Sequence, residues 1–365
     1  MNDSDTITLR QLTAAAFVAV LSPMVRRFPR ALSETAGRSA WLCIPLALLP
    51  LGAALGVLRL LYRRQGPGTG FADILCAALG RIPGRLVTGL YGLWLTVYAG
   101  FLLRSGAERF ISTVYPGAGP GIFCTVMVLL CLPAAAGKLK SLARTAMLFR
   151  PVLAVLFPLL ALLTLKELQP ELLWPPEPGA LPSLGIGALQ ILNLLSAVGF
   201  LAFFSDRLEP SPTGRGRPLA WLGATLGILL LMTVSCLGMF GPALTARLRY
   251  PFFMLARDLS VLGSLERAEP VIIALWVLSD FVMQSLLLKA AGGSLRFCLG
   301  RRPDGPVGVL TLLPGAAALA AALVIPGELT AFEALSETVI PLCNAGMALV
   351  LPAAVLGIGL LRRKL

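Results

Sequence analysis

The sequence predicts an all-α integral membrane protein that crosses the bilayer several times. The chain has 365 residues, of which 57% are hydrophobic and only 13% are charged, and its mean hydropathy is +0.83. Soluble globular domains carry about 25% charged residues, and disordered chains combine low hydrophobicity with high net charge. This composition excludes both classes.

Stretches almost free of charge recur along the whole chain. A helix needs about 20 apolar residues to cross a hydrocarbon core about 30 Å thick, and it satisfies its own backbone hydrogen bonds in lipid. The alternation of a closed β-barrel is not visible. We therefore expect one polytopic domain, residues 1–365, with ten transmembrane helices near residues 11–25, 40–58, 86–103, 110–137, 145–165, 182–205, 218–240, 270–294, 306–326 and 338–361.

Basic residues predict the orientation of these helices. If the N-terminus is cytoplasmic, most of the 31 lysine and arginine residues fall in cytoplasmic segments and most acidic residues fall outside. The positive-inside rule then places both termini in the cytoplasm and the loops around 166–181 and 327–337 outside. We attribute the net charge of +13 to this excess of basic residues on the cytoplasmic side and to interactions with anionic lipids. We therefore expect no nucleic acid partner.

The first apolar stretch is too short to cross alone. Residues 11–25 make about 22 Å of helix, contain Ser22-Pro23, and are followed by Arg26. The acidic start of the chain lacks the basic region of a cleaved signal, so we expect this helix to be retained. A helix interrupted near Ser22-Pro23 is one interpretation, and an ordinary proline-kinked helix is the other.

The sixth stretch is also irregular, with Asn193, Ser196 and Gly199 before it ends near Ser205. If the ten helices form two inverted repeats of five, at about 8–165 and 182–361, the first and sixth helices correspond. Interrupted helices at corresponding positions point to a central site of the transporter type. The alternative is a glycine-rich packing face.

Two shorter segments have amphipathic spacing. Residues 71–79 place apolar side chains at helical spacing before Gly80, which is expected to end the helix. Residues 242–265 alternate leucines with arginines, which suits a helix at the external interface. This helix is either a lid or docking surface, or a surface helix with no further role.

Asp280 is the acidic residue that lies well inside an apolar stretch. A carboxylate there costs at least about 2.5 kcal/mol, so it should face the bundle interior or a wet cavity. It is either a functional residue, which couples a proton or cation or serves as the counter-charge for an amine, or a structural residue that is neutral or reaches toward Lys289.

Trp94 and Tyr98 lie four residues apart in the third helix and therefore share a face. They either form the wall of a pocket or simply pack. Arg104 and Glu108 have the same spacing, and we expect a surface pair at the outer end of this helix.

Catalytic and metal chemistry is not expected. The sequence contains no histidine, and its seven cysteines include no CxxC pair, so they are read as small buried residues. His-based metal sites and triads are excluded, and we predict no cofactor, no metal and no enzyme activity.

One block of sequence resembles a known family. Residues 241–281, and above all Leu265-Glu266-Arg267 followed by an acid, an apolar run and Trp276, resemble the B-subunit of spore germination receptors, the endospore germination permease family. Residues 28–32, the segment from Gly80 to Gly84 and the opening 7–11 are similar to the same family.

This resemblance implies the fold of the amino acid–polyamine–organocation superfamily, a LeuT-type five-plus-five inverted repeat with broken helices one and six. It implies a place in the inner spore membrane beside an A-subunit and a lipoprotein C-subunit. It further implies that the ligand-binding residues, with Asp280 as a candidate from its position, are Leu21, Ser22, Pro23, Trp94, Tyr98, Gly199, Phe200, Val282 and Met283.

The predicted function follows from the resemblance and the broken helices together. We expect a nutrient (germinant) sensor that binds a small molecule, with an amino acid as the expected class, in a small and largely uncharged pocket. The alternative is a proton-coupled amino-acid transporter of the same superfamily, for which Asp280 would be the coupling residue.

Overall fold

The computed structural model describes residues 5–63, 68–177, 179–209, 217–258, 269–300, 308–325 and 329–362. Within these ranges the regular structure is helical apart from one isolated β-bridge. Seven of the described segments are long and apolar enough to cross a membrane, and two shorter apolar helices, Pro120–Ala136 and Leu310–Val324, accompany them. The all-α membrane class predicted from composition is confirmed.

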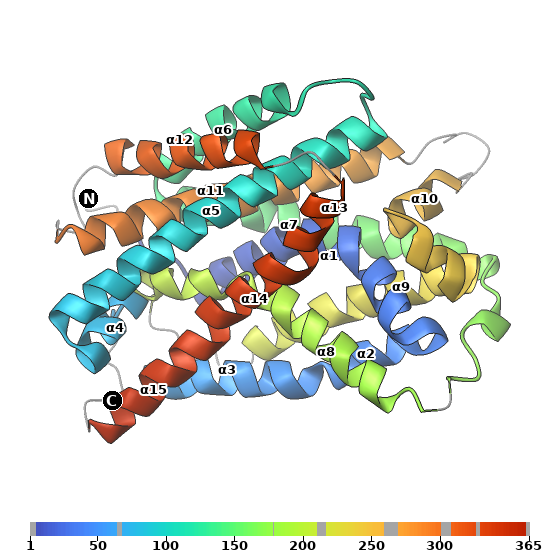
Figure 1. Ribbon diagram of the computed structural model, residues 1–365, viewed down its shortest axis with the longest axis horizontal. Coiled ribbons are helices and arrows are strands. Elements are labelled where there is room, and N and C mark those ends of the chain that lie inside the picture. Colours follow the sequence, from blue (N-terminus) through green and yellow to red (C-terminus); the bar gives the residue numbers. More distant parts are fainter. Residues whose placement is uncertain are drawn as a thin grey trace.

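The helices form one elongated bundle (Figure 1). The α-helices are α1 (Leu9–Ala36), α2 (Cys43–Leu46), α3 (Leu48–Arg63), α4 (Phe71–Leu79), α5 (Arg81–Thr113), α6 (Pro120–Ala136), α7 (Leu139–Leu163), α8 (Leu181–Ser196), α9 (Arg217–Arg247), α10 (Pro251–Asp258), α11 (Glu269–Cys298), α12 (Gly308–Val324), α13 (Leu329–Ala334), α14 (Ile340–Ala345) and α15 (Leu351–Leu361). Short 3-10 segments are η1 (Gly37–Leu42), η2 (Thr164–Lys166), η3 (Pro170–Leu172) and η4 (Gly199–Arg207), and two π-helical turns are η5 (Leu335–Val339) and η6 (Gly346–Val350).

The first helix forms the centre of the bundle. Every residue of α1 from Ala14 to Val25 is buried, and α1 contacts α7, α8, α9 and α11. A helix that is apolar on all sides belongs in the interior. It begins at Thr8, whose hydroxyl accepts a hydrogen bond from Gln11 N within a capping box.

The predicted break of the first helix is wrong in its simple form. α1 continues as an α-helix through Pro23 and Pro29 to Ala36. The sequence placed Arg26 and Arg27 beyond the end of a short helix, but these residues continue it because they turn toward a polar cavity in the protein and not toward lipid.

The sixth segment changes its helical type midway. α8 ends at Ser196, and after two turn residues the chain continues as η4 from Gly199. This change coincides with the interruption predicted near Ser196–Gly199.

The third crossing is longer than predicted. The apolar stretch ended at residue 103, but α5 runs to Thr113, about 50 Å in all. The helix carries Arg104 into a buried position, where it pairs with Glu108 at 2.8 Å and not at the surface as expected. Because charged residues of this segment find partners inside the protein, they do not end the helix.

The loop predicted at 327–337 is helical over its described residues. The chain is helical from Leu329, through α13 and the π-helical turn η5, into α14. Its acidic residues suggested a loop, but Glu337 faces a cavity of the bundle.

The two amphipathic segments behave differently. The helix at 71–79 is confirmed as α4, and Gly80 ends it with φ +103°. In the second segment α9 continues past a kink at Gly241 to Arg247, and α10 buries Phe252 and Leu255 against its neighbours. The rest of this segment, including Leu265-Glu266-Arg267, lies outside the described residues.

The beginning of α1 and the end of α15 lie at the same end of the molecule. Ile7 forms a parallel bridge with Leu208, through bonds from Ile7 N to Arg207 O and from Glu209 N to Ile7 O, both 2.9 Å. Asp5 pairs with Arg207. Arg207 lines a cavity beside α4, and Arg362 donates to two backbone carbonyls at the end of α4.

Candidate functional site

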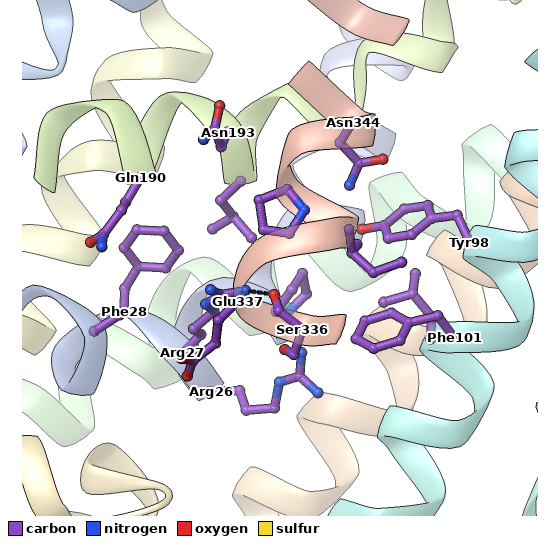
Figure 2. A pocket seen from close by; sticks show the side chains of 16 residues that line it. Arg26, Arg27, Phe28, Tyr98, Phe101, Gln190, Asn193, Ser336, Glu337 and Asn344 are labelled. Carbon is purple, nitrogen blue, oxygen red and sulfur yellow. Dashed lines mark hydrogen bonds between the residues drawn. The ribbon is translucent and has the colours of Figure 1, made fainter. Parts of the chain in front are cut away.

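A central cavity lies between α1, α5, α8 and the η5–α14 segment (Figure 2). Its volume of about 60 Å³ accommodates a few water molecules, whereas small-molecule sites usually measure about 300–1,000 Å³. The polar side chains around it are Arg26, Arg27, Tyr98, Gln190, Asn193, Ser336, Glu337 and Asn344. This conformation is closed around a polar centre.

The cavity is charged, so the expectation of a largely uncharged pocket is wrong. Arg27 donates a hydrogen bond to the backbone carbonyl of Ser336, across the space between α1 and η5 (Figure 2). Arg26 makes no hydrogen bond or ion pair with any residue in the described ranges. Glu337 is the one carboxylate among the lining residues, so a guanidinium and a carboxylate are both available to a ligand.

Two aromatic residues shape one wall of the cavity. Tyr98 is 3% exposed and lines it, and the ring of Trp94 stacks on Tyr98 with centroids 6.1 Å apart and an interplanar angle of 12°. Trp94 Nε1 donates to Asn344 Oδ1 at 3.2 Å. Trp94 therefore orients two lining residues without lining the cavity itself, because Asn344 and Tyr98 both face it (Figure 2).

The last crossing contributes through its π-helical turn. Ser336 and Glu337 belong to η5, where the helix is wider than an α-helix. Such turns inside α-helices occur frequently at functional sites, because they shift side chains out of regular register. No pattern in the sequence predicts this turn. Because residues 327–337 are predicted as an external loop, Ser336 and Glu337 are not predicted as lining residues.

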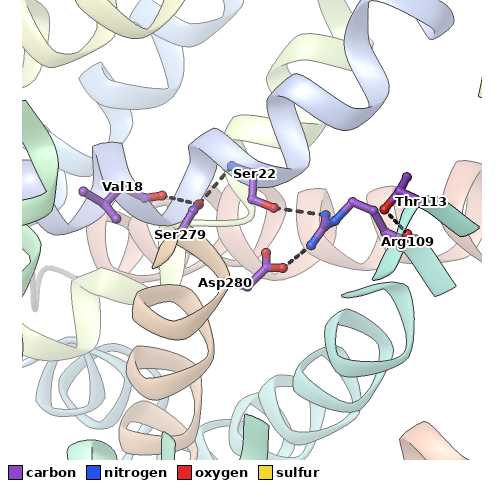
Figure 3. A network of polar contacts seen from close by, with 6 residues as sticks. All are labelled: Val18, Ser22, Arg109, Thr113, Ser279 and Asp280. Atoms are coloured by element: carbon purple, nitrogen blue, oxygen red, sulfur yellow. Dashed lines mark hydrogen bonds and ion pairs between the residues drawn. The ribbon is translucent and has the colours of Figure 1, made fainter. Parts of the chain in front are cut away.

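A hydroxyl group of α11 inserts into α1 at Ser22, next to the lining residue Pro23 (Figure 3). Ser279 Oγ accepts a hydrogen bond from Ser22 N at 2.9 Å and donates one to Val18 O at 2.5 Å. These two backbone groups bond to each other in a regular α-helix, and side-chain insertion into this ladder is a known cause of local bending. The irregularity predicted at Ser22-Pro23 is therefore a single turn of α1 in which the Ser279 hydroxyl takes the place of one backbone hydrogen bond.

Asp280 forms an ion pair with Arg109 of α5 (Figure 3). The Arg109 side chain is 5% exposed, and it also donates to Ser22 Oγ at 3.1 Å and lies 4.9 Å from the centroid of the Trp276 ring. Asp280 therefore joins α11 to α5 and, through Arg109, to α1.

Lys289, the alternative partner that the sequence suggests for Asp280, bonds to backbone carbonyls and not to Asp280. Lys289 Nζ donates to Ala135 O at 3.2 Å and to Gly137 O. Sequence reasoning missed Arg109 because residues 104–109 were read as the outer end of a helix.

Of the predicted ligand-binding residues, Pro23 and Tyr98 line the central cavity. Pro23 also lines a smaller void of about 10 Å³ together with Asp280 and Met283. That void has room for no more than one water molecule.

Other predicted site residues lie in the packed interior. Leu21 and Val282 are fully buried, Phe200 is 1% exposed, and none of them lines either cavity. Gly199 allows η4 to pack closely against η6, because a Cβ placed at Gly199 would lie 2.4 Å from the Cβ of Ala348.

Comparison with known structures supports the arrangement described above. The crystal structure of MhsT in complex with L-phenylalanine, a LeuT-fold protein, superposes with a TM-score of 0.68 at 17% sequence identity, covering 97% of this chain and 88% of MhsT. At this identity the likeness shows the fold alone. The chain has the fold of LeuT-type transporters.

Sequence comparison identifies the family. The protein YfkT of Bacillus subtilis (strain 168), described as a spore germination protein, is 22% identical over 255 residues, which is 69% of each chain. The model of the spore germination protein family matches residues 6–322. The resemblance seen in residues 241–281 is thereby confirmed, and the chain belongs to the spore germination protein family of permease-like membrane proteins.

Proposed function

We propose that this protein is the nutrient-sensing subunit of a spore germination receptor, and that it binds an amino acid in the central cavity. The observation that carries the proposal is that Arg26 and Glu337 line the same polar cavity at the middle of a transporter fold. Arginine binds carboxylates through charge-assisted hydrogen bonds. A zwitterion would place its carboxylate at Arg26 and its ammonium at Glu337.

A ligand would enter this cavity through a second, adjoining cavity. Arg26, Arg27, Ser336 and Glu337 line both spaces, and the second one adds Arg30, Glu34 and Arg249. Because basic residues outnumber acidic ones in this entrance, it attracts carboxylates. The small volume of the closed cavity means that binding requires an opened conformation, and a ligand that prefers one conformation shifts the population toward it.

A proton-coupled amino-acid transporter is the second candidate, and Asp280 is the residue that favours it. A coupling carboxylate has to change its protonation state during the cycle. In this structure Asp280 is paired with Arg109, which gives it a structural role as a link between α11 and α5. Uptake of an amino acid by this chain alone in proteoliposomes, driven by a proton gradient, would establish the transporter instead.

The remaining parts of the proposal concern assembly and location. We place the protein in the inner spore membrane, with an A-subunit and a lipoprotein C-subunit as partners. We also propose ten transmembrane helices in two inverted repeats, 8–165 and 182–361, with the sixth helix interrupted at the centre. Spores that lack the gene should form normally and fail to germinate on one class of nutrient.

Replacing Arg26 should raise the nutrient concentration needed for half-maximal germination at least about tenfold. A hydrogen bond to a charged group contributes about 1.5–3 kcal/mol, which corresponds to at least that change in affinity. The measurement is the fall in optical density of spores carrying Arg26→Gln across a series of amino acids. Arg63→Gln, at an exposed arginine of α3, is the matched control and should respond like the wild type. An unchanged response of Arg26→Gln would remove this residue from the site.

Both chain termini should be cytoplasmic, and the loop around 166–181 should be external. The distribution of lysine and arginine is the reason. Single cysteines placed at residue 176 and at the C-terminus of a cysteine-free variant can be labelled in intact cells with a membrane-impermeant maleimide. We expect the cysteine at residue 176 to be labelled and the C-terminal cysteine to remain unlabelled. Labelling of the C-terminal cysteine in intact cells would contradict this topology.

A further inference from the structure

A second and larger cavity opens at the side of the bundle between α1, α7 and α9. Its volume is about 600 Å³, which is within the range of small-molecule sites. We call it the lateral groove. Most of its lining is apolar and comes from all three helices: Phe17, Ala154, Pro158, Gly227, Ile228 and Leu231.

Three arginines, one from each helix, line the same groove. They are Arg10 at the start of α1, Arg150 in α7 and Arg217 at the start of α9. None of the three makes a hydrogen bond or ion pair with another residue in the described part of the chain, and no acidic residue is among the groove's described lining residues. The groove is therefore lined by three guanidinium groups, and its described lining residues supply no counter-ion.

On the α9 side, the apolar part of the groove is lined by small residues, which leave room for a ligand. Ala220, Ala224 and Gly227 are exposed, and a Cβ built on Gly227 would meet no atom within 4 Å. An extended chain can therefore lie along α9 without displacing a side chain.

A positive cluster joined to an apolar channel matches one class of ligand. We propose that the lateral groove binds an anionic phospholipid, with its headgroup phosphate at Arg10, Arg150 and Arg217 and an acyl chain along Phe17, Ile228 and Leu231. Basic pockets between transmembrane helices on the cytoplasmic side bind anionic headgroups, and the charge distribution of the sequence assigns these arginines to that side. A zwitterionic phospholipid lacks the net charge, and a water-soluble phosphate lacks the chain.

The test is retention of added lipid by the purified full chain in detergent, measured by native mass spectrometry. We expect saturable binding of phosphatidylglycerol at least tenfold tighter than binding of phosphatidylcholine. Each arginine near an anionic headgroup contributes up to about fivefold. The triple variant Arg10→Gln/Arg150→Gln/Arg217→Gln should bind both lipids equally weakly.

Matched controls separate a built site from general attraction by charge. Arg59→Gln/Arg63→Gln/Arg144→Gln removes the same charge from exposed arginines outside the groove and should keep the preference for phosphatidylglycerol. If both triple variants lose the preference equally, the attraction is non-specific and the proposal is overturned.

A second pair of variants tests the acyl-chain channel without touching an arginine. Gly227 lines the groove, so Gly227→Leu would fill it, whereas Gly223 lies exposed one turn away on the same helix and is not among the lining residues; a Cβ added at either glycine meets no atom within 4 Å. We expect Gly227→Leu alone to weaken lipid binding at least fivefold. Equal binding by both variants, or displacement of phosphatidylglycerol by sn-glycerol 3-phosphate at similar concentrations, would indicate a water-soluble phosphate site and overturn the proposal.

Discussion

The variant Asp280→Asn should lower the free energy of unfolding by about 3–5 kcal/mol, because it removes one partner of a buried ion pair and leaves the other charge uncompensated. The remaining charge would be Arg109, whose side chain is 5% exposed. Its bond to Ser22 Oγ and its contact with the ring of Trp276 do not neutralise it. This is the largest stability effect that we expect from a single substitution.

The reciprocal variant should be milder. Arg109→Gln leaves Asp280, whose side chain is 21% exposed and therefore partly hydrated. The double variant Arg109→Gln/Asp280→Asn contains no unpaired charge and should recover at least half of the free energy lost in Asp280→Asn. Such non-additivity is the signature of a direct interaction.

Unfolding of the four proteins in detergent, followed by tryptophan fluorescence, measures this cycle. Additive effects of the two single variants would show that Asp280 and Arg109 act independently. An Asp280→Asn protein of normal stability that no longer responds to the nutrient would instead assign Asp280 to ligand or proton binding.

Adding one methyl group at Gly199 should destabilise the protein by about 1–3 kcal/mol, the usual cost of overpacking. The added Cβ of Gly199→Ala would lie 2.4 Å from the Cβ of Ala348, and one of the two segments has to move. These segments are η4 and the π-helical turn η6, both next to the central cavity's helices.

A compensating variant distinguishes close packing from ligand contact. In Gly199→Ala/Ala348→Gly the clashing methyl group is gone, and the next atom, the Cα of residue 348, lies 3.3 Å from the new Cβ. We expect this pair to regain most of the stability and the nutrient response. Failure of Ala348→Gly to rescue the response of a stable double variant would place Gly199 in the ligand site.

The sequence predicted the helical class and the order of the elements because both depend on average hydrophobicity. It located α4 and its end at Gly80 because local chemistry decides a helix stop. It misplaced the end of α5 and the start of the last crossing for one reason. Charged residues indicate the membrane surface in a sequence, whereas Arg109 is buried beside Asp280 of α11 and Glu337, although exposed, lines the central cavity.

The candidate site was predictable in part. Ser22, Pro23 and Tyr98 lie at or beside the polar centre, as helix breaks and aromatic spacing suggested. Arg26 was visible as the residue that ends the first apolar stretch, but its direction depends on what packs around α1. Asn344 and Ser336 could not be found, because the register of a π-helical turn is set by tertiary packing and leaves no period in the sequence.

The bridge between Ile7 and Leu208 has a mechanical consequence. Two backbone hydrogen bonds and the contact of Asp5 with Arg207 join the segment before α1 to the end of η4, so these parts of the two central helices translate together. We expect any relative motion of α1 and the sixth segment to be a rotation about this joint, with an amplitude that grows toward the other end. We therefore expect ligand binding in the central cavity to displace most the end of α1 at Ala36 and the start of α8 at Leu181, which lie farthest along these helices from the joint.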